Sequence, residues 1–383
     1  MPRFKSTILL AIACLTIGRV SPIYADDWPL VRGDAFGTGV AHTALADELD
    51  VLWKYPAGKD SGFDATPVIA DGVIYIGDSA GTFQAVRLAD GKRVWTKEFA
   101  DSGFAAGAAI ENGMIYVGDV NGIVRCLAAN DGKEKWNQKL EGEVYAGPTP
   151  NADFVLFTCE AGTLTWLNKK DGKQHNTFRI EAPLRCTPTI AAGRIVLAGC
   201  DSRLHIIDVE SGKEIDSVEI DAPTGSTAAM RDERAYFGTE GGTFYAINIP
   251  SARDKKASIA WKYRDPQRNQ PIRAAAAVSD QIVVFGSQSK AIYVLGPANG
   301  EEKWKLPTRA RVESGTVIAG NRVVAATASG KIYLLDAKSN EVKWEYDAGG
   351  GFTASPAVVD GRMILGNTDG TLYCFGAKEK SKK

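Results

Sequence analysis

Short apolar runs separated by polar turns recur along this chain with a period of roughly forty residues. In the clearest copy, two apolar runs, Thr66–Ala70 and Val73–Gly77, flank Asp71-Gly72, a pair suited to the positive φ angles of a tight hairpin turn. A third run, Thr82–Val86, follows, and a further turn at Asp90-Gly91 leads into a fourth. Each copy therefore predicts four short strands joined by tight turns.

One position, most often glycine, ends the second strand and marks each copy of the repeat. The equivalent residues are Gly77, Gly118, Thr158, Gly199, Gly238, Gly286, Ala326 and Gly366. Subtracting these positions gives spacings of 41, 40, 41, 39, 48, 40 and 40 residues, so only the fifth copy carries an insertion. Strand-type sequence with this period predicts an all-β fold, an eight-bladed β-propeller whose blades are four-stranded antiparallel sheets.

The fourth strand of most copies carries a tryptophan, four residues after the turn. The tryptophans at this position are Trp53, Trp95, Trp136, Trp261, Trp304 and Trp344. An indole buries a large apolar area, so we expect each one to hold neighbouring blades together. Blades three and four have Asn176 and Asp216 instead, which predicts weaker docking at those two interfaces.

The two ends of the chain are expected to share one blade. The last copy supplies only three strands, whereas Val51–Tyr55 supplies a lone fourth-strand segment before the first full copy. We therefore expect the N-terminal strand to complete blade eight and close the ring, which removes the open sheet edges.

The first residues have the pattern of a secretory signal peptide. Met1–Lys5 is basic, and the apolar run Thr7–Gly18 that follows is too short to span a membrane comfortably. We predict a periplasmic or secreted protein without a transmembrane segment in the mature chain. The predicted parts are a signal peptide (1–25), an N-terminal arm (26–49), the propeller (50–376) and a basic tail (377–383).

The amino-acid composition limits the classes of partner that the protein is expected to bind. Of its 383 residues, 44% are hydrophobic, which is enough for a large core. The 45 Lys and Arg residues balance 46 Asp and Glu, which argues against a generic nucleic-acid-binding surface. We expect a monomer whose partner is another envelope or secreted protein.

Five cysteines follow the predicted signal peptide, an odd number for an oxidising compartment. Cys126 and Cys374 occupy third-strand positions and are predicted to be buried core thiols. Cys159, Cys186 and Cys200 lie near one another in blades three and four. A disulfide among these three and three independent small core residues are both consistent with the pattern.

The residues just before each first strand should surround the mouth of the central channel, because the innermost strand of a blade runs along the axis. They are Asp64, Ala105, Tyr145, Arg185, Gly225, Arg273, Glu313 and Thr353. Arg185 and Arg273 are candidates to hold an anionic ligand, and Asp64 and Glu313 to hold a metal or act as bases. The alternative is a water-filled polar channel in which Arg273 simply pairs with Glu313.

Other chemistry is weaker. His42, His175 and His205 are dispersed, so no zinc or haem site is predicted. The longest parts of the repeat, 250–258 and 264–271, are polar. This composition is typical of exposed binding loops. It is equally expected of surface loops that have simply become longer, because lengthening such a loop costs little entropy.

The repeat Gly-Asp-x-x-Gly-x-[Leu/Phe]-x-Ala-[Leu/Val] followed by Asp-Gly-[Lys/Glu]-x-x-Trp resembles that of quinoprotein propellers and of the outer-membrane assembly factor BamB. The resemblance extends from about Trp28 to Phe375, and the opening segment Trp28–Asp34 is also similar. It implies the fold more than the function, since these residues dock blades and form turns.

The quinoprotein dehydrogenases in this resemblance bind pyrroloquinoline quinone (PQQ) with Ca²⁺, between a Trp floor and a disulfide of adjacent cysteines. No two cysteines are adjacent here, and the chain is shorter than such enzymes. We therefore expect a non-catalytic protein without a cofactor, a BamB-like scaffold for protein interactions.

Two alternatives remain open. One is a small PQQ-dependent or other quinone-dependent oxidoreductase, or a sensor of a related anionic cofactor, with Arg185 and Arg273 as ligands. The other is carbohydrate binding at the channel mouth, with Tyr145 as a stacking residue. Three further stacking candidates are Phe63, Phe104 and Phe352.

Overall fold

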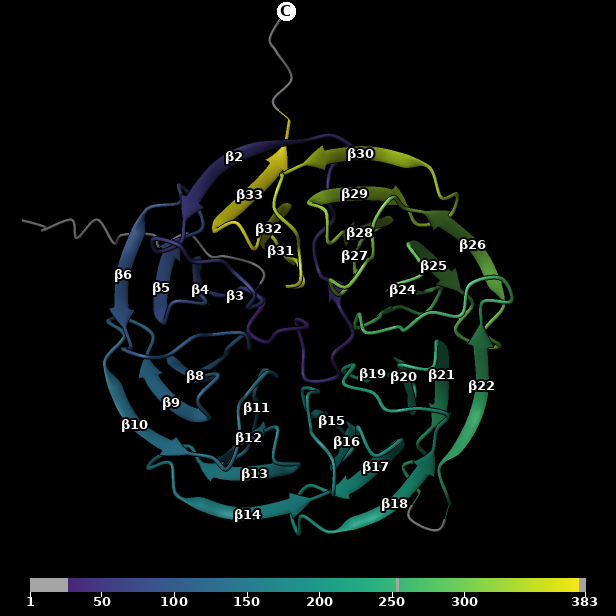
Figure 1. Cartoon of the computed structure of the whole chain (residues 1–383), viewed down its shortest axis with the longest axis horizontal. Coiled ribbons are helices and arrows are strands. Elements are labelled where there is room, and N and C mark those ends of the chain that lie inside the picture. Colours follow the sequence, from purple (N-terminus) through teal and green to yellow (C-terminus); the bar gives the residue numbers. More distant parts are fainter. Residues whose placement is uncertain (1–26, 253–254, 379–383) are drawn as a thin grey trace, which may run out of the picture.

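The chain forms a closed ring of eight sheets, each with four antiparallel strands, around a central axis, in a computed structural model that describes residues 27–252 and 255–378 (Figure 1). One sheet gains a fifth strand, which pairs parallel. In each blade the first strand lies nearest the axis and the fourth lies at the rim (Figure 1). The predicted eight-bladed β-propeller is confirmed. The predicted signal peptide lies outside the described residues.

Blades one to four follow directly from the repeat. Their strands are β3 (Val68–Ala70), β4 (Val73–Gly77), β5 (Thr82–Arg87) and β6 (Arg93–Glu98); β7 (Ala109–Glu111), β8 (Met114–Gly118), β9 (Ile123–Ala128) and β10 (Glu134–Lys139); β11 (Thr149–Asn151), β12 (Phe154–Thr158), β13 (Thr163–Asn168) and β14 (Gln174–Arg179); and β15 (Thr189–Ala191), β16 (Arg194–Ala198), β17 (Arg203–Asp208) and β18 (Glu214–Glu219).

Blades five to eight include both ends of the described chain. Their strands are β19 (Ala229–Arg231), β20 (Arg234–Gly238), β21 (Thr243–Asn248) and β22 (Ser258–Arg264); β23 (Ala277–Val278), β24 (Val283–Ser287), β25 (Ala291–Leu295) and β26 (Glu302–Pro307); β27 (Val317–Ala319), β28 (Arg322–Ala326), β29 (Lys331–Asp336) and β30 (Val342–Asp347), joined by β1 (Val40–Ala41); and β31 (Ala357–Val359), β32 (Arg362–Gly366), β33 (Thr371–Ala377) and β2 (Leu49–Pro56).

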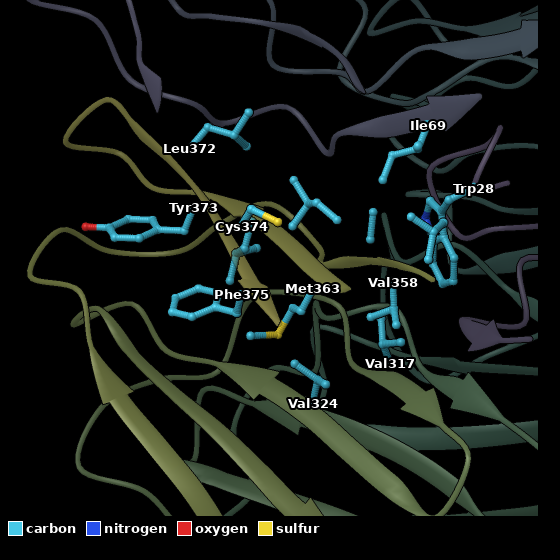
Figure 2. Packing of buried hydrophobic residues seen from close by; sticks show 14 of the residues in the cluster. Trp28, Ile69, Val317, Val324, Val358, Met363, Leu372, Tyr373, Cys374 and Phe375 are labelled. Carbon is cyan, nitrogen blue, oxygen red and sulfur yellow. The ribbon is translucent and has the colours of Figure 1, made fainter. Parts of the chain in front are cut away.

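Blade eight closes the ring as predicted. Strand β2 pairs antiparallel with β33, from Leu49 opposite Ala377 to Pro56 opposite Thr371. A continuous apolar cluster packs blades seven, eight and one together at this seam, and Figure 2 shows Met363 and Phe375 of blade eight close to Val324 of blade seven.

The tryptophans dock blades through one recurring contact. The indole Nε1 donates a hydrogen bond to the carbonyl oxygen of a residue one or two positions after the third strand of the next blade. The pairs are Trp53 to Leu88 (3.1 Å), Trp95 to Ala129 (2.9 Å), Trp136 to Lys169 (2.8 Å), Trp261 to Pro297 (3.0 Å) and Trp304 to Ala337 (3.3 Å). Trp344 instead packs edge-on against Phe375 of blade eight.

Cross-strand pairing explains how each indole fits. In six blades the Trp on the fourth strand pairs with a smaller residue on the third strand, beside a β-bulge that reorients the side chain. The pairs are Ala85 with Trp95, Cys126 with Trp136, Ala246 with Trp261, Val294 with Trp304, Leu334 with Trp344 and Cys374 with Trp53.

The prediction of weak docking after blade three is wrong. Blade three inverts the pair: Trp166 is on the third strand, opposite Asn176 on the fourth. Trp166 is 1% exposed and its Nε1 donates to the Val209 carbonyl of blade four at 3.1 Å, while Asn176 donates to Ser211 at 2.9 Å. Blade four has Ile206 opposite Asp216 and no indole in either place.

The repeat glycine is required by close approach to the next blade. A Cβ atom would lie 2.4 Å from Phe104 at Gly77, and 2.5 Å from Phe63 at Gly366. Phe63, Phe104 and Phe352 are accordingly buried, at 0%, 1% and 0% exposure, so the hypothesis that these three stack on carbohydrate is wrong.

The disulfide that the sequence left open as one alternative is absent from the structure, in which all five described cysteines, from Cys126 to Cys374, are free thiols. Cys159 packs between blades two and three and Cys186 between blades three and four, which separates them. The Cys200 thiol donates to the Thr224 carbonyl at 3.6 Å. Cys126 and Cys374 are buried core thiols, as predicted.

The N-terminal arm crosses the axis and binds the innermost strands through its backbone (Figure 1). Trp28 and Ile69 exchange two hydrogen bonds, and amides of later first strands donate to arm carbonyls. These bonds are Ile110 to Pro29 (2.9 Å), Ile190 to Ala35 (3.0 Å), Met230 to Phe36 (2.7 Å), Val278 to Thr38 (2.9 Å) and Ile318 to Gly39 (2.9 Å). At the equivalent place blade three has Pro150, which has no N–H to donate.

No helix in the part of the chain that the structure describes is long and apolar enough to cross a membrane.

We expect Trp166→Ala to lower the free energy of unfolding by about 3–5 kcal/mol, because it removes a buried indole. Asn176→Ala, which removes only a hydrogen bond on the fourth strand, should cost about 1 kcal/mol. Urea unfolding followed by circular dichroism measures both. Equal losses in the two variants would contradict a docking role for Trp166.

We expect Cys200 to react first with iodoacetamide at pH 8, since it is the one partly exposed thiol among the described residues. Burial raises the pKa of Cys126 to about 11 and of Cys186 and Cys374 to about 12, which suppresses their thiolates. After unfolding without reductant, peptide mass spectrometry should find all five alkylated. An unlabelled pair would restore the disulfide hypothesis.

Candidate functional site

The N-terminal arm closes one end of the central channel and leaves a cavity of about 200 Å³ above it. Val31 and Arg32 of the arm form the floor of this cavity. Val31 fits there because glycines stand at the first strands of blades two and three: a Cβ atom at Gly107 or Gly147 would lie 2.4 or 2.5 Å from its methyl group.

The wall of the cavity is the ring of residues predicted from the repeat, here called the channel-mouth ring. The lining ring members are Asp64, Ala105, Tyr145, Arg185, Arg273, Glu313 and Thr353. Gly225, the eighth member, lines an adjoining cavity of about 380 Å³ that also contacts Arg185 and Arg273. The lack of a side chain at Gly225 leaves this space between the two arginines.

Both arginines of the ring are held by glutamates of the blade before them. Arg185 Nε and Nη2 bind Glu160 at 2.6 and 2.9 Å, and Arg273 Nε and Nη2 bind Glu240 at 2.8 and 3.0 Å. These hydrogen bonds raise the pKa of both guanidinium groups. The bidentate pairing fixes where each positive charge lies.

The predicted Arg273–Glu313 pair is secondary. Arg273 Nη1 lies 4.0 Å from Glu313, and Arg311 Nη1 lies 3.9 Å from it. Gln288 donates to Glu313 at 2.7 Å.

The opposite arc of the ring is rich in oxygen. Glu313, Thr353 and Asp64 come from three consecutive blades, seven, eight and one. The Thr353 hydroxyl donates to Asp64 Oδ1 at 3.0 Å, and Asp64 Oδ2 has no partner among the described residues. The ring therefore places its cations in blades four and six and its carboxylates in blades seven and one, with Glu313 beside Arg273.

Arg32 was missed by the sequence analysis because it belongs to the arm, outside the repeat. Its side chain is 3% exposed, and Nη2 donates to the carbonyls of Ala276 (2.9 Å) and Thr316 (2.6 Å). Nε and Nη1 are buried without a hydrogen-bond partner among the described residues. Burial, partly offset by Asp34, lowers the Arg32 pKa to about 10, so the group is still charged at neutral pH.

Glu160 and Glu240 were also missed, although the repeat holds the signal. Both come two residues after the marker position, in register with Cys200 and Gln288, where the residue type varies between blades. In blade four the structure puts that position at Ala198, one residue before the predicted Gly199, because Ala198 pairs with Leu204 as Gly238 pairs with Phe244. A comparison of this position across the copies could have found a second polar ring beside the first.

Metal binding by side chains alone has little support. Within residues 27–252 and 255–378, no three His, Cys, Asp or Glu side chains are grouped to hold a metal ion. His205 bonds Glu214 at 2.6 Å and Asp201 at 3.0 Å, and His175 stacks on Phe154.

Two relatives match segments of this chain. A 1-butanol dehydrogenase (cytochrome c) from Thauera butanivorans is 31% identical over 93 residues, 23% of this chain and 14% of that protein. A quinohemoprotein alcohol dehydrogenase from Comamonas testosteroni is 30% identical over 83 residues, 20% of this chain and 12% of that protein. The matches thus span a small part of both relatives' length.

Solved structures share the whole fold. BamB from Moraxella catarrhalis has a TM-score of 0.73 at 15% identity and covers 88% of this chain and 100% of its own. The quinohemoprotein alcohol dehydrogenase from Comamonas testosteroni has a TM-score of 0.74 at 16% identity, covering 95% and 83%. At these identities the likeness concerns the fold alone.

The names of the sequence relatives overturn two predictions, that the chain is not an enzyme and that it has no cofactor. Both predictions rested on the missing adjacent-cysteine pair and on chain length. Those features describe the surroundings of one cofactor site, and a propeller can supply other groups at the same channel.

A sequence model of the family described as "Outer membrane protein assembly factor BamB" matches residues 80–248, 228–316 and 291–382. Together these ranges cover more than half of the chain, including blades two to seven. The chain belongs to this family of PQQ-like propellers.

Proposed function

We propose that this protein is a quinone-dependent oxidoreductase that holds PQQ with Ca²⁺ at the channel-mouth ring. The relatives named as alcohol dehydrogenases support the reaction class. The observation that carries the proposal is Arg32, a buried cation at the channel floor with two unpartnered nitrogens. A buried unpaired charge is costly, and an anionic ligand would offset that cost.

The cations fit the anionic part of such a cofactor, which has three carboxylates. Arg32 would face it from the floor, and Arg185 and Arg273 from the wall. The guanidinium fork matches a carboxylate in geometry, and each wall arginine already has its position fixed by a glutamate.

The oxygen arc fits Ca²⁺ only in part. Calcium takes six to eight oxygen ligands. Glu313 and the Thr353 hydroxyl could supply two, so the cofactor and water would have to supply the rest. Tyr145, 45% exposed, is the one aromatic side chain among the described residues that line this cavity, and it would supply the stacking face.

The bound ortho-quinone would supply a two-electron acceptor that converts an alcohol to its aldehyde. The chain would bind the alcohol at the mouth and accept its hydroxyl proton. Asp64 suits that step because Oδ2 has no partner among the described residues, whereas Glu313 lies near Arg273 and Arg311.

We further propose that the protein works in the periplasm or outside the cell. The signal-peptide pattern of residues 1–25 supports this placement.

We expect calorimetric titration with PQQ and Ca²⁺ to give one saturable site. Arg185→Ala and Arg273→Ala should each weaken the Kd by about 10-fold or more, the value of one charge-assisted hydrogen bond. Arg32→Met keeps the side-chain volume and should weaken it at least as much. The loaded protein should reduce an artificial electron acceptor with 1-butanol.

Arg203→Ala is the matched control, since Arg203 lies on β17 and pairs with Glu219 rather than lining the channel. It should bind PQQ like the parent chain. Thermal unfolding of each free variant checks that it is folded. No heat and no shift in unfolding temperature for the parent chain would overturn the proposal.

A further inference from the structure

A cavity of about 410 Å³ opens at the rim between blades four and five. It lies where an indole docks the blades elsewhere in the ring. Ile206 and Asp216, the cross-strand pair that should contain a tryptophan, both line it. The Asp216 carboxylate turns instead to the loop of blade five, where it accepts from the Ala257 amide at 2.7 Å.

The partner of the missing indole is also in place. In five blades the residue after the third strand donates its amide to the turn of the first hairpin and accepts from an indole through its carbonyl. Leu88, for example, donates to Gly72 at 2.9 Å and accepts from Trp53. Ile249 is the equivalent residue of blade five, because its amide donates to Glu233 at 2.7 Å.

The carbonyl of Ile249 receives no donor from the described residues, and Ile249 lines the cavity. In blade eight the equivalent arginine, Arg362, donates to the same carbonyl as Trp53. In blade four the equivalent residue, Arg194, does not donate to the Ile249 carbonyl. It donates to the carbonyls of the next two residues, Pro250 and Ser251. The inserted loop is thus held to one side of the acceptor.

The lining of this cavity suits an amphipathic aromatic side chain. Ile206, Ile215 and Ile249 provide apolar walls, and Ile215 is 42% exposed. Charged groups of Lys255 and Lys256 stand at the rim. An aromatic side chain with a ring donor combines a large apolar face and one polar atom, as this cavity does.

We propose that this cavity is a docking site for a tryptophan side chain presented by a partner protein. The occupant is inferred from the ring itself, which fills the equivalent place at other interfaces with an indole that donates to the equivalent carbonyl. The partner's indole would complete the blade four to blade five interface from outside. This site is separate from the channel and does not depend on the proposed oxidoreductase function.

The test uses N-acetyl-5-fluorotryptophanamide and the full chain, followed by fluorine NMR. A single side chain in such a pocket should bind with a Kd on the order of 0.1–1 mM. Asp216→Trp fills the cavity from within, so it should abolish binding and raise the unfolding midpoint by about 2 °C or more. Asp216→Ala leaves the cavity open and should retain binding.

Asn176→Trp is the matched control, because at that interface Trp166 already bonds the acceptor carbonyl. It should bind the probe like the parent chain. A capped 4-benzoylphenylalanine amide, photolysed with the unmodified chain, should label peptides containing Ile215 or Ile249, which keeps the test valid if Asp216→Trp fails to fold. An octapeptide with one central Trp should bind more tightly than its Trp→Ala twin.

Three outcomes would overturn the proposal: no binding of the capped probe, equal binding to the parent chain and Asp216→Trp, or binding of free tryptophan without binding of the capped form. The last would indicate a small-molecule site that requires the charged amino and carboxyl groups.

Discussion

The docking of each blade onto the next is the contact on which this ring depends. A blade is a small, twisted sheet that could not bury its two faces alone, so its stability comes from its neighbours. The indole of one blade covers the turn of the next and satisfies one carbonyl there, as Trp136 does at Gly172 and Lys169. Because the same contact is repeated, departures from it are visible one blade at a time.

Rigid docking of the blades also fixes the positions of the side chains that line the channel, as a binding site requires. The residues before the first strands have little freedom, since the aromatic or aliphatic residue beside them fills the space above the repeat glycine of the previous blade. Phe104 above Gly77 and Val144 above Gly118 are examples. The charges of Arg185 and Arg273 are therefore presented at fixed points on the wall, and the arm sets Arg32 at the floor.

The repeat made the fold, the ring closure and the position of the channel-mouth ring predictable from sequence. The repeat did not predict two kinds of feature: a residue that replaces the function of a missing one, and residues that lie outside the repeat. Trp166, on the third strand, makes the docking contact that Asn176 on the fourth strand cannot make. Comparing one aligned position at a time does not show this exchange between two strands. Arg32 could not be placed, because the path of the arm follows from backbone bonds to blades far apart in sequence. The stacking hypothesis for Phe63 was wrong because the repeat glycine of the previous blade, Gly366, leaves the space in which Phe63 is buried, and the sequence does not show that contact.

The arm and the closing strand together constrain how this chain can fold. Residues near the N-terminus pair with the last strand, Leu49 opposite Ala377, and the arm bonds to strands as late as β27. Such contacts close very long loops, which slows folding. Until the last strand is available, β2 has no partner and the ring keeps an open edge. Unpaired strand edges are therefore exposed to aggregation until nearly all of the chain is available.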